Sequence, residues 1–136
     1  MVTWAALAAV LAATPAAAQV AQMTGAWRGY AQGVTFNLVV EPNGRFSEQE
    51  IMGQMMTMQT GHIQPLGGDL VAFVVEDWQP RTRPVYHPTG TVGGYYTQEP
   101  NAKPPGGTWR ILFNGPRSMT MRDARLGGQV TFTRQR

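Results

Sequence analysis

The stretch TFNLVVEPNGRFSEQEI, residues 35–51, decides the fold class. Phe36, Leu38 and Val40 alternate with polar or outward positions, which is the period of a β-strand that buries one face. An Asn-Gly pair follows at 43–44, and this dipeptide is a strong signal for a hairpin turn. The stretch therefore predicts two antiparallel strands joined by a tight turn.

The same pattern continues on both sides of this hairpin. Short alternating runs are separated by Gly, Pro or Asn turns, a spacing that is typical of an antiparallel sandwich or barrel. We predict an all-β fold, a single small antiparallel up-and-down β-barrel of about eight strands, with an open sandwich as the alternative. The predicted strands are 26–31, 35–41, 45–51, 55–64, 70–78, 91–97, 108–114, 118–122 and 128–134.

Residues 79–107 interrupt this pattern with six prolines and five glycines. We place one short edge strand here, at 91–97, and expect the Pro-rich flanks to be loops. Tyr95 and Tyr96 lie in this segment and Trp78 lies beside it. Aromatic rings on such a segment either contact a ligand or fasten the loop to the barrel, and the sequence leaves both interpretations open.

The first 18 residues predict a secretory signal peptide. They contain no charged side chain, and an apolar run at 5–13 is too short to span a bilayer. Ala16 and Ala18 supply the small residues of an A-x-A cleavage site. We therefore expect a signal peptide at 1–18, a barrel domain at 19–136, and a periplasmic or secreted location in a bacterium. No later stretch is long and apolar enough to predict a membrane-spanning helix.

Composition excludes several functions. The chain has no cysteine, so disulfides and thiolate chemistry are excluded. The net charge of +3 comes from 11 basic and 8 acidic residues, and the basic residues are scattered along the chain. A nucleic-acid backbone is usually followed by a basic run or by interleaved aromatic residues, so we expect no nucleic-acid partner.

Methionine is concentrated in two segments. Met56, Met58 and His62 share one face of a predicted strand, and Met119 and Met121 share one face of another. We expect the four methionines to line the barrel interior as adaptable apolar surface. The alternative is a Cu(I) site with Met56, Met58 and His62 as ligands, because thioether sulfur suits this ion.

The strand at 45–51 carries two carboxylates on one face. Glu48 and Glu50 share that face with Phe46, and we expect it to be exposed because neighbouring carboxylates on one strand diverge from any common substrate. Gln49 and its neighbours on the other face would then point inward. A polar side chain in an apolar pocket would orient a ligand.

Both ends of the chain carry a family resemblance. MTGAWRG, residues 23–29, resembles the Gly-x-Trp start of calycins, the barrel group that includes lipocalins and avidins. Residues 24–46 are similar to the first hairpin of avidins, and GGQVTFTRQ, residues 127–135, to their last strand. The resemblance implies that Trp27 closes one end of the barrel and that Arg134 packs over its ring, as in lipocalins. The middle strands carry Met, Gln and Gly instead of the polar biotin pocket of avidins, so biotin is not the expected ligand.

We therefore expect a non-enzymatic protein that binds a small, largely apolar ligand in the barrel mouth. The alternatives are an envelope structural or protein-interaction module and a Met-rich periplasmic Cu(I)-binding protein. No catalytic residue and no cofactor are expected. The residues expected to line the pocket are Phe36, Leu38, Gln49, Met56, Met58, Phe73, Trp78, Tyr95, Tyr96, Trp109, Met119 and Met121.

Overall fold

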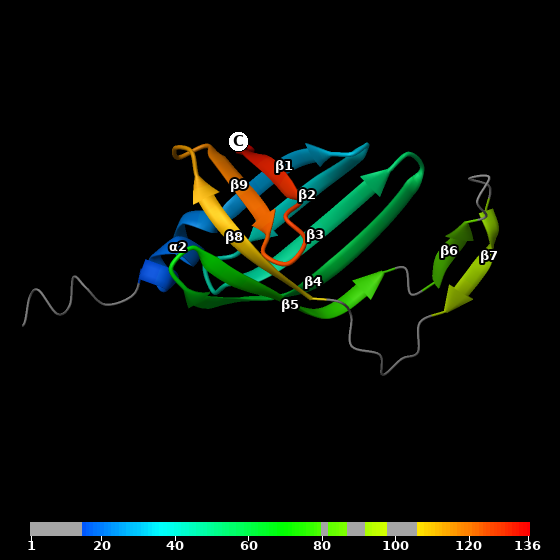
Figure 1. The fold of residues 1–136 in the computed structure, drawn as a ribbon, viewed down its shortest axis with the longest axis horizontal. Coiled ribbons are helices and arrows are strands. Elements are labelled where there is room, and N and C mark those ends of the chain that lie inside the picture. Colours follow the sequence, from blue (N-terminus) through cyan, green and yellow to red (C-terminus); the bar gives the residue numbers. More distant parts are fainter. Residues whose placement is uncertain (1–14, 80–81, 87–91, 98–105) are drawn as a thin grey trace, which may run out of the picture.

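The computed structural model describes residues 15–79, 82–86, 92–97 and 106–136. The described residues form one helix and ten strands (Figure 1). The elements are α2 (Pro15–Met23), β1 (Gly25–Ala31), β2 (Val34–Val40), β3 (Arg45–Met52), β4 (Met55–Gly67), β5 (Leu70–Gln79), β6 (Thr82–Tyr86), β7 (Val92–Thr97), β8 (Gly107–Phe113), β9 (Ser118–Asp123) and β10 (Gln129–Arg134).

Eight of the strands close into an antiparallel barrel in the order β1-β10-β9-β8-β5-β4-β3-β2. Each strand of the barrel lies next to its neighbour in the chain, apart from the β6–β7 segment between β5 and β8, and β10 returns to pair with β1. The predicted up-and-down barrel is therefore confirmed, and the open sandwich is wrong. Closure removes the sheet edges that an open sandwich would leave unpaired.

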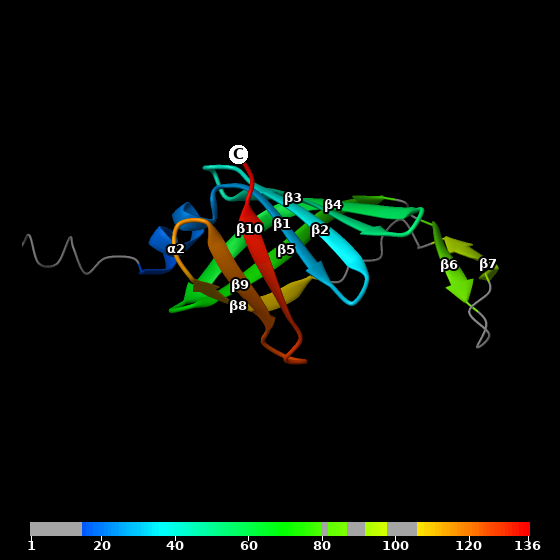
Figure 2. The same ribbon diagram turned by 90° about the horizontal axis from the view of Figure 1, so that it is seen from above.

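The segment between β5 and β8 differs from the prediction. β7 pairs with β6 in a separate two-stranded sheet, so the expected edge strand is not part of the barrel. Figures 1 and 2 show this hairpin beyond one end of the barrel, opposite the end that carries α2. Sequence reasoning missed β6 because Pro84 lies within it, and proline lowers the expectation of a strand.

The hairpin that decided the fold class is present as β2 and β3. Its turn is held by hydrogen bonds from Glu41 N to Arg45 O and from Gly44 N to Glu41 O. Gly44 has a φ of 84°, which a residue without a Cβ adopts at no steric cost. The turn sets the register, so that Val40 lies opposite Phe46 and Leu38 lies opposite Glu48.

One end of the barrel interior, next to α2, is filled by apolar side chains. We call it the filled half, and we call the other end, where β3 and β5 finish, the mouth. Met23 at the end of α2 is fully buried, so the helix acts as a plug. The largest fully buried side chains all belong to the filled half: Met23, Trp27, Leu38, Val40, Val71 and Met119.

Trp27 and Arg134 close the filled half as the calycin resemblance implies. The two residues are paired between β1 and β10, and the guanidinium carbon lies 4.2 Å from the centre of the Trp27 ring. Arg134 also donates hydrogen bonds to the carbonyls of Gln22, Thr24 and Pro116. The Trp27 indole N–H donates to Met23 O at 2.8 Å. One arginine therefore ties the end of α2, the following residue and the β8–β9 turn to the last strand.

The predicted cleavage site after Ala18 falls within α2, and residues 1–14 lie outside the described residues. Gln19, the first residue after that site, is buried and its side-chain amide donates to Ile111 O at 3.0 Å. In the described parts of the chain, no helix has the length and apolar character needed to cross a bilayer.

Candidate ligand-binding site

A cavity of about 170 Å³ lies in the mouth of the barrel. Five strands contribute to its wall, and the lining combines aromatic rings with three carboxyl groups. No basic side chain in the described part of the chain belongs to it. The lining residues are Phe46, Glu48, Glu50, Gln59, Phe73, Val75, Gly106, Gly107, Trp109 and Asp123.

Glu48 and Glu50 point into this cavity, so the prediction that their strand face is exposed is wrong. The register explains why. Phe46 is buried, and in a strand every second residue points to the same side, so Glu48 and Glu50 follow Phe46 inward. They lie opposite Leu38 and Phe36, two positions that face the interior of β2.

The Asn-Gly turn could have been used to predict from the sequence that Glu48 and Glu50 point inward. It pairs Val40 with Phe46, and once both apolar residues are placed inside, the next residues on that face of β3 must be the two glutamates. The prediction relied instead on the divergence of neighbouring carboxylates along one strand. Burial of carboxylates is costly, and that cost is reduced here because the mouth is hollow and because polar groups surround the acids.

Glu48 is the most perturbed acid of the site. Burial raises its pKa from the ordinary value of 4.5 to about 8, and hydrogen bonding to Glu50 and the negative charge of Glu50 act in the same direction. Gln59 donates a hydrogen bond from Nε2 to Glu48 Oε1 at 3.3 Å, which partly offsets the rise. At neutral pH the Glu48 carboxyl is therefore mostly protonated.

Asp123 brings the third carboxylate from the end of β9. Its Oδ1 accepts hydrogen bonds from the backbone N–H groups of Leu126 and Arg125, at 2.9 and 2.8 Å. These two bonds lower the pKa of Asp123, so its carboxylate is ionised at neutral pH. Asp123 continues the interior face that holds Met119 and Met121 deeper in the barrel.

Aromatic rings form the apolar part of the wall. Phe46 and Phe73 meet edge to face, with ring centroids 4.9 Å apart. Trp109 lies next to them on β8, where Gly107 leaves room for its indole: a Cβ on Gly107 would approach Trp109 Nε1 to 2.6 Å. A ligand in the cavity would therefore contact both ring carbons and carboxyl oxygens, because rings and carboxyl groups lie side by side on β3 and on the β8–β9 pair.

Most of the residues expected to line the pocket do face the barrel interior, but of those whose side chains the structure describes only Phe73 and Trp109 reach the cavity. Trp78 is buried opposite Gln59. The side chains of Tyr95 and Tyr96 lie outside the described residues. Four expected lining residues belong to the packed interior rather than to the cavity: Phe36, Leu38, Met119 and Met121.

Gln49, Met56 and Met58 were predicted to line the interior, and this prediction is wrong. Met58 pairs with Gln49, and Met56 pairs with Ile51, all on the outer face of the β3–β4 pair. Met56 is 52% exposed and Met58 is 38% exposed. Gln49 hydrogen-bonds to Met56 and Asn37 on the outside of the barrel. Alternation correctly placed Met56 and Met58 on one face but could not say which face points inward.

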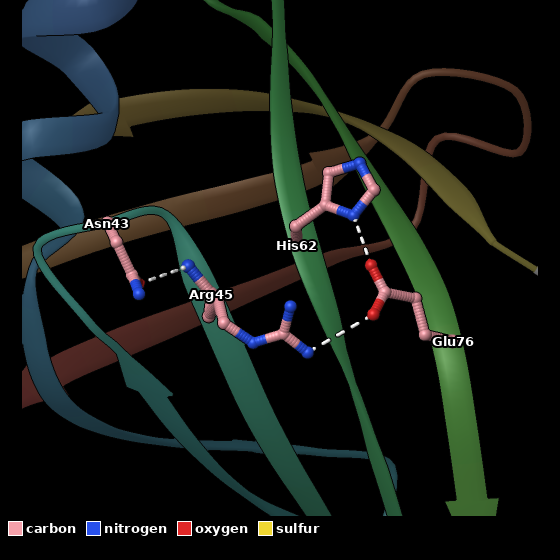
Figure 3. Close-up of polar contacts among 4 residues, drawn as sticks. All are labelled: Asn43, Arg45, His62 and Glu76. Atoms are coloured by element: carbon pink, nitrogen blue, oxygen red, sulfur yellow. Dashed lines mark hydrogen bonds and ion pairs between the residues drawn. The ribbon is translucent and has the colours of Figure 1, made fainter.

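The ligand set proposed for Cu(I) does not come together. Met58 and His62 are four residues apart on one strand, a separation of about 13 Å at a strand rise near 3.3 Å per residue. His62 instead lies beside Glu76, with Nδ1 2.5 Å from Oε1, and Arg45 contacts the other oxygen of Glu76 at 3.1 Å (Figure 3). Both contacts lower the pKa of Glu76, so its ionised carboxylate accepts the Nδ1–H proton.

The methionines near the β3–β4 turn are also divided between two faces. Met52 and Met55 pair across the turn on the lumen side, whereas Met56 and Met58 point outward. Within the described ranges, no three His, Asp or Glu side chains converge as a metal site. The arrangement therefore offers at most two thioethers on either face.

No protein-family model matches the chain, and no curated protein matches it in sequence. The functional assignment of this protein therefore rests on the geometry and chemistry of the mouth.

Proposed function

We propose that this protein is a non-enzymatic, calycin-like binding barrel that holds a small ligand in its mouth. The observation that carries the proposal is the contrast along the interior. The filled half is packed with apolar side chains, whereas the mouth encloses a cavity of about 170 Å³ between two phenylalanines, a tryptophan and a few polar groups. Such a combination is typical of small-molecule sites.

The size and lining of the cavity define the ligand further. Phe46, Phe73 and Trp109 provide apolar contact, so the ligand has an apolar body of about the size of one aromatic ring. The carboxyl groups require a partner that donates hydrogen bonds, because a buried polar group without a partner is costly. The ligand is thus apolar at one end and polar at the other, rather than apolar throughout.

Two adjacent valines on β5 provide a test of this proposal. Val75 lines the cavity, whereas Val74 pairs with His62 on the outer face. Val75→Trp should fill the cavity and abolish binding of benzyl alcohol, a small probe with an aromatic body and one donor, in a chemical-shift titration. Val74→Trp is the matched control and should bind like the natural protein. Equal binding in both variants, with unfolding midpoints close to that of the natural protein, would overturn the proposal.

We also propose that the protein is exported and that residues 1–18 are removed. The support is the A-x-A pattern at Ala16 and Ala18, together with the packing of the residue after it, since Gln19 and Met23 belong to the plug of the filled half. Cleavage after Ala18 would leave this plug on the barrel. Intact mass of secreted or periplasmic material should correspond to a chain that begins at Gln19, and a species that retains Trp4 would contradict export with cleavage.

The protein-interaction alternative has less support from the surface. A row that crosses the outer face holds Tyr30, Ile51 and Met56, with the polar Thr35 between Tyr30 and Ile51; Tyr30 is the most exposed of the three apolar residues. Next to it runs a polar ladder in which Arg28 donates to Asn37 and Asn37 donates to Gln49. The row is narrow, and isolated exposed apolar side chains are ordinary on protein surfaces. The cavity therefore carries the functional proposal.

A further inference from the structure

We propose that the ligand of the mouth is a small organic cation: an amine or amidine with an aromatic or similarly compact apolar body. This inference rests on the proposed function and adds the chemical class of the ligand. The cavity lies in the barrel mouth, where Glu48 and Glu50 line the β3 wall beside Phe46 and Asp123 lines the opposite wall on β9, paired with Trp109. Among the described residues, no Lys, Arg or His lines it.

The carboxyl groups provide the charge complement. Asp123 uses Oδ1 for two backbone N–H groups, and no contact to its Oδ2 is found among the described residues. Glu50 faces the lumen from β3, across the cavity from Asp123 on β9. An ammonium or amidinium group has several N–H donors and no acceptor, so it can pair with a carboxyl oxygen on either wall. A neutral alcohol can satisfy one of them, and a carboxylate ligand would be repelled.

The rings favour an organic cation over a metal ion. Phe46, Phe73 and Trp109 offer the faces and edges of aromatic rings beside the carboxyl groups. A cation near an aromatic face gains from the ring quadrupole, and its hydrocarbon body gains from removal from water. Metal ions of the oxygen-binding type require several converging oxygens, and no three acidic side chains converge in that way in the described part of the chain.

A cation in the cavity would also change the proton on Glu48. The groups that face Glu48 are Glu50 on its own strand, Gln59 on β4 and Asp123 on β9, while β5 and β8 contribute Val75 and Trp109. Nothing among these groups is positive, so the free site retains a proton on Glu48. A bound ammonium group supplies the missing positive charge and favours the ionised carboxyl. Binding therefore releases up to one proton, and affinity rises as the pH increases toward the pKa of Glu48 in the free site, which is about 8.

The test compares benzylamine, benzyl alcohol and benzoate, which share one aromatic body and differ in charge. At pH 6.5 we expect benzylamine to bind about 10–100-fold more tightly than benzyl alcohol, the range that corresponds to a hydrogen bond with a charged partner. Benzoate should show no saturable binding. Calorimetry in two buffers of different ionisation enthalpy should detect proton release with benzylamine and none with benzyl alcohol.

Variants of the carboxyl groups distinguish their contribution to binding from that of the rest of the site. Glu48→Gln should abolish proton release, and Glu50→Gln should reduce the preference for benzylamine over benzyl alcohol, because Asp123 then remains as the ionised carboxylate of the site. Neither change should alter the affinity for benzyl alcohol by more than about twofold, since both variants keep the shape of the cavity. Glu41→Gln is the matched control, because Glu41 is exposed at the β2–β3 turn, outside the cavity.

The outcomes distinguish this inference from the proposed function. If benzyl alcohol binds in the cavity and benzylamine binds no more tightly, the cation proposal is wrong and the binding proposal stands. If Ca²⁺ competes with benzylamine at equal concentration, the carboxyl groups attract any cation and the organic-cation proposal is wrong. If none of the three probes binds to the natural protein, the proposed function fails and the cation proposal fails with it.

Discussion

The filled half and the mouth are built from the same strands, yet they differ in chemistry. β3 begins with Phe46 in the core and continues inward with Glu48 and Glu50. β9 runs from Met119 and Met121 to Asp123 in the same way. Each strand therefore changes from core residues to site residues within four positions, without any change in its alternation.

This difference shows how a small barrel can combine stability with binding. Apolar burial at one end supplies the free energy of folding, at roughly 25 cal/mol for each Å² removed from water. The other end can then retain a cavity and buried acids, each of which reduces stability. Substitutions in the two regions test this division of the interior. The largest loss of stability is expected in the filled half.

Met119→Ala should cause the largest loss. Met119 is fully buried in the filled half, so its truncation leaves a cavity and should lower the free energy of unfolding by about 2–5 kcal/mol. Chemical denaturation measures this change. Met56→Ala is the matched control, because Met56 is half-exposed on the outer face and the same truncation should lower the free energy by only about 0.5 kcal/mol. Equal losses would mean that the interior is not divided as described.

Glu48 should make stability depend on pH. Its pKa is raised in the folded protein to about 8 from 4.5, so the folded state holds the proton more tightly than the unfolded chain. The stabilisation is fully present below about pH 4.5 and is lost as the pH rises through 8. Allowing for solvent in the cavity, the loss should be roughly 1–3 kcal/mol.

Glu48→Gln should remove that dependence, because the amide does not titrate. Denaturation midpoints of the two proteins between pH 5 and pH 9 provide the comparison. Asp123 and Glu76 have lowered pKa values and lose their contribution as the pH falls instead, so they do not produce the same trend. A natural protein whose stability does not change between pH 5 and pH 8 would contradict the placement of Glu48 inside the mouth.

Arg134→Ala should weaken the closure of the filled half. The substitution removes the contact with the Trp27 ring, a loss of about 0.5–2 kcal/mol, and it leaves three backbone carbonyls without their donor. Arg134→Lys retains the charge but cannot reach three carbonyls with one planar group, so it should be intermediate. Thermal unfolding measures the order, and a lysine variant as stable as the natural protein would show that charge alone suffices.

Replacement of both Met56 and Met58 by Leu should have the smallest effect. Both side chains are on the outer face, and the exchange conserves volume, so the free energy of unfolding should change by less than about 0.5 kcal/mol. Binding of benzyl alcohol in the mouth should not change. A Cu(I) competition titration provides the contrary outcome: tight stoichiometric Cu(I) binding that is lost in this variant would establish the copper alternative.

The sequence by itself determined the barrel. Three local signals predicted it, and each corresponds to a feature of the folded protein: the Asn-Gly turn, the alternation of Phe36, Leu38 and Val40, and the regular spacing of turns. Trp27 and Arg134 could also be named, since a short terminal motif carries them. The interior position of Met119 and Met121 was predicted from their alternation with polar residues, and both side chains are buried.

Only the tertiary structure decided which face of β3 and β4 points inward. Alternation divides a strand into two faces but does not orient them, and both faces of β4 carry methionine or threonine. The register to β2 settles the choice, and it places Glu48 and Glu50 in the lumen with Met56 and Met58 outside. The cavity also depends on residues from five strands, from Phe46 to Asp123, which only closure of the barrel brings together. Local periodicity therefore fixed the strands, whereas the chemistry of the mouth arose from pairing between strands that are distant in the chain.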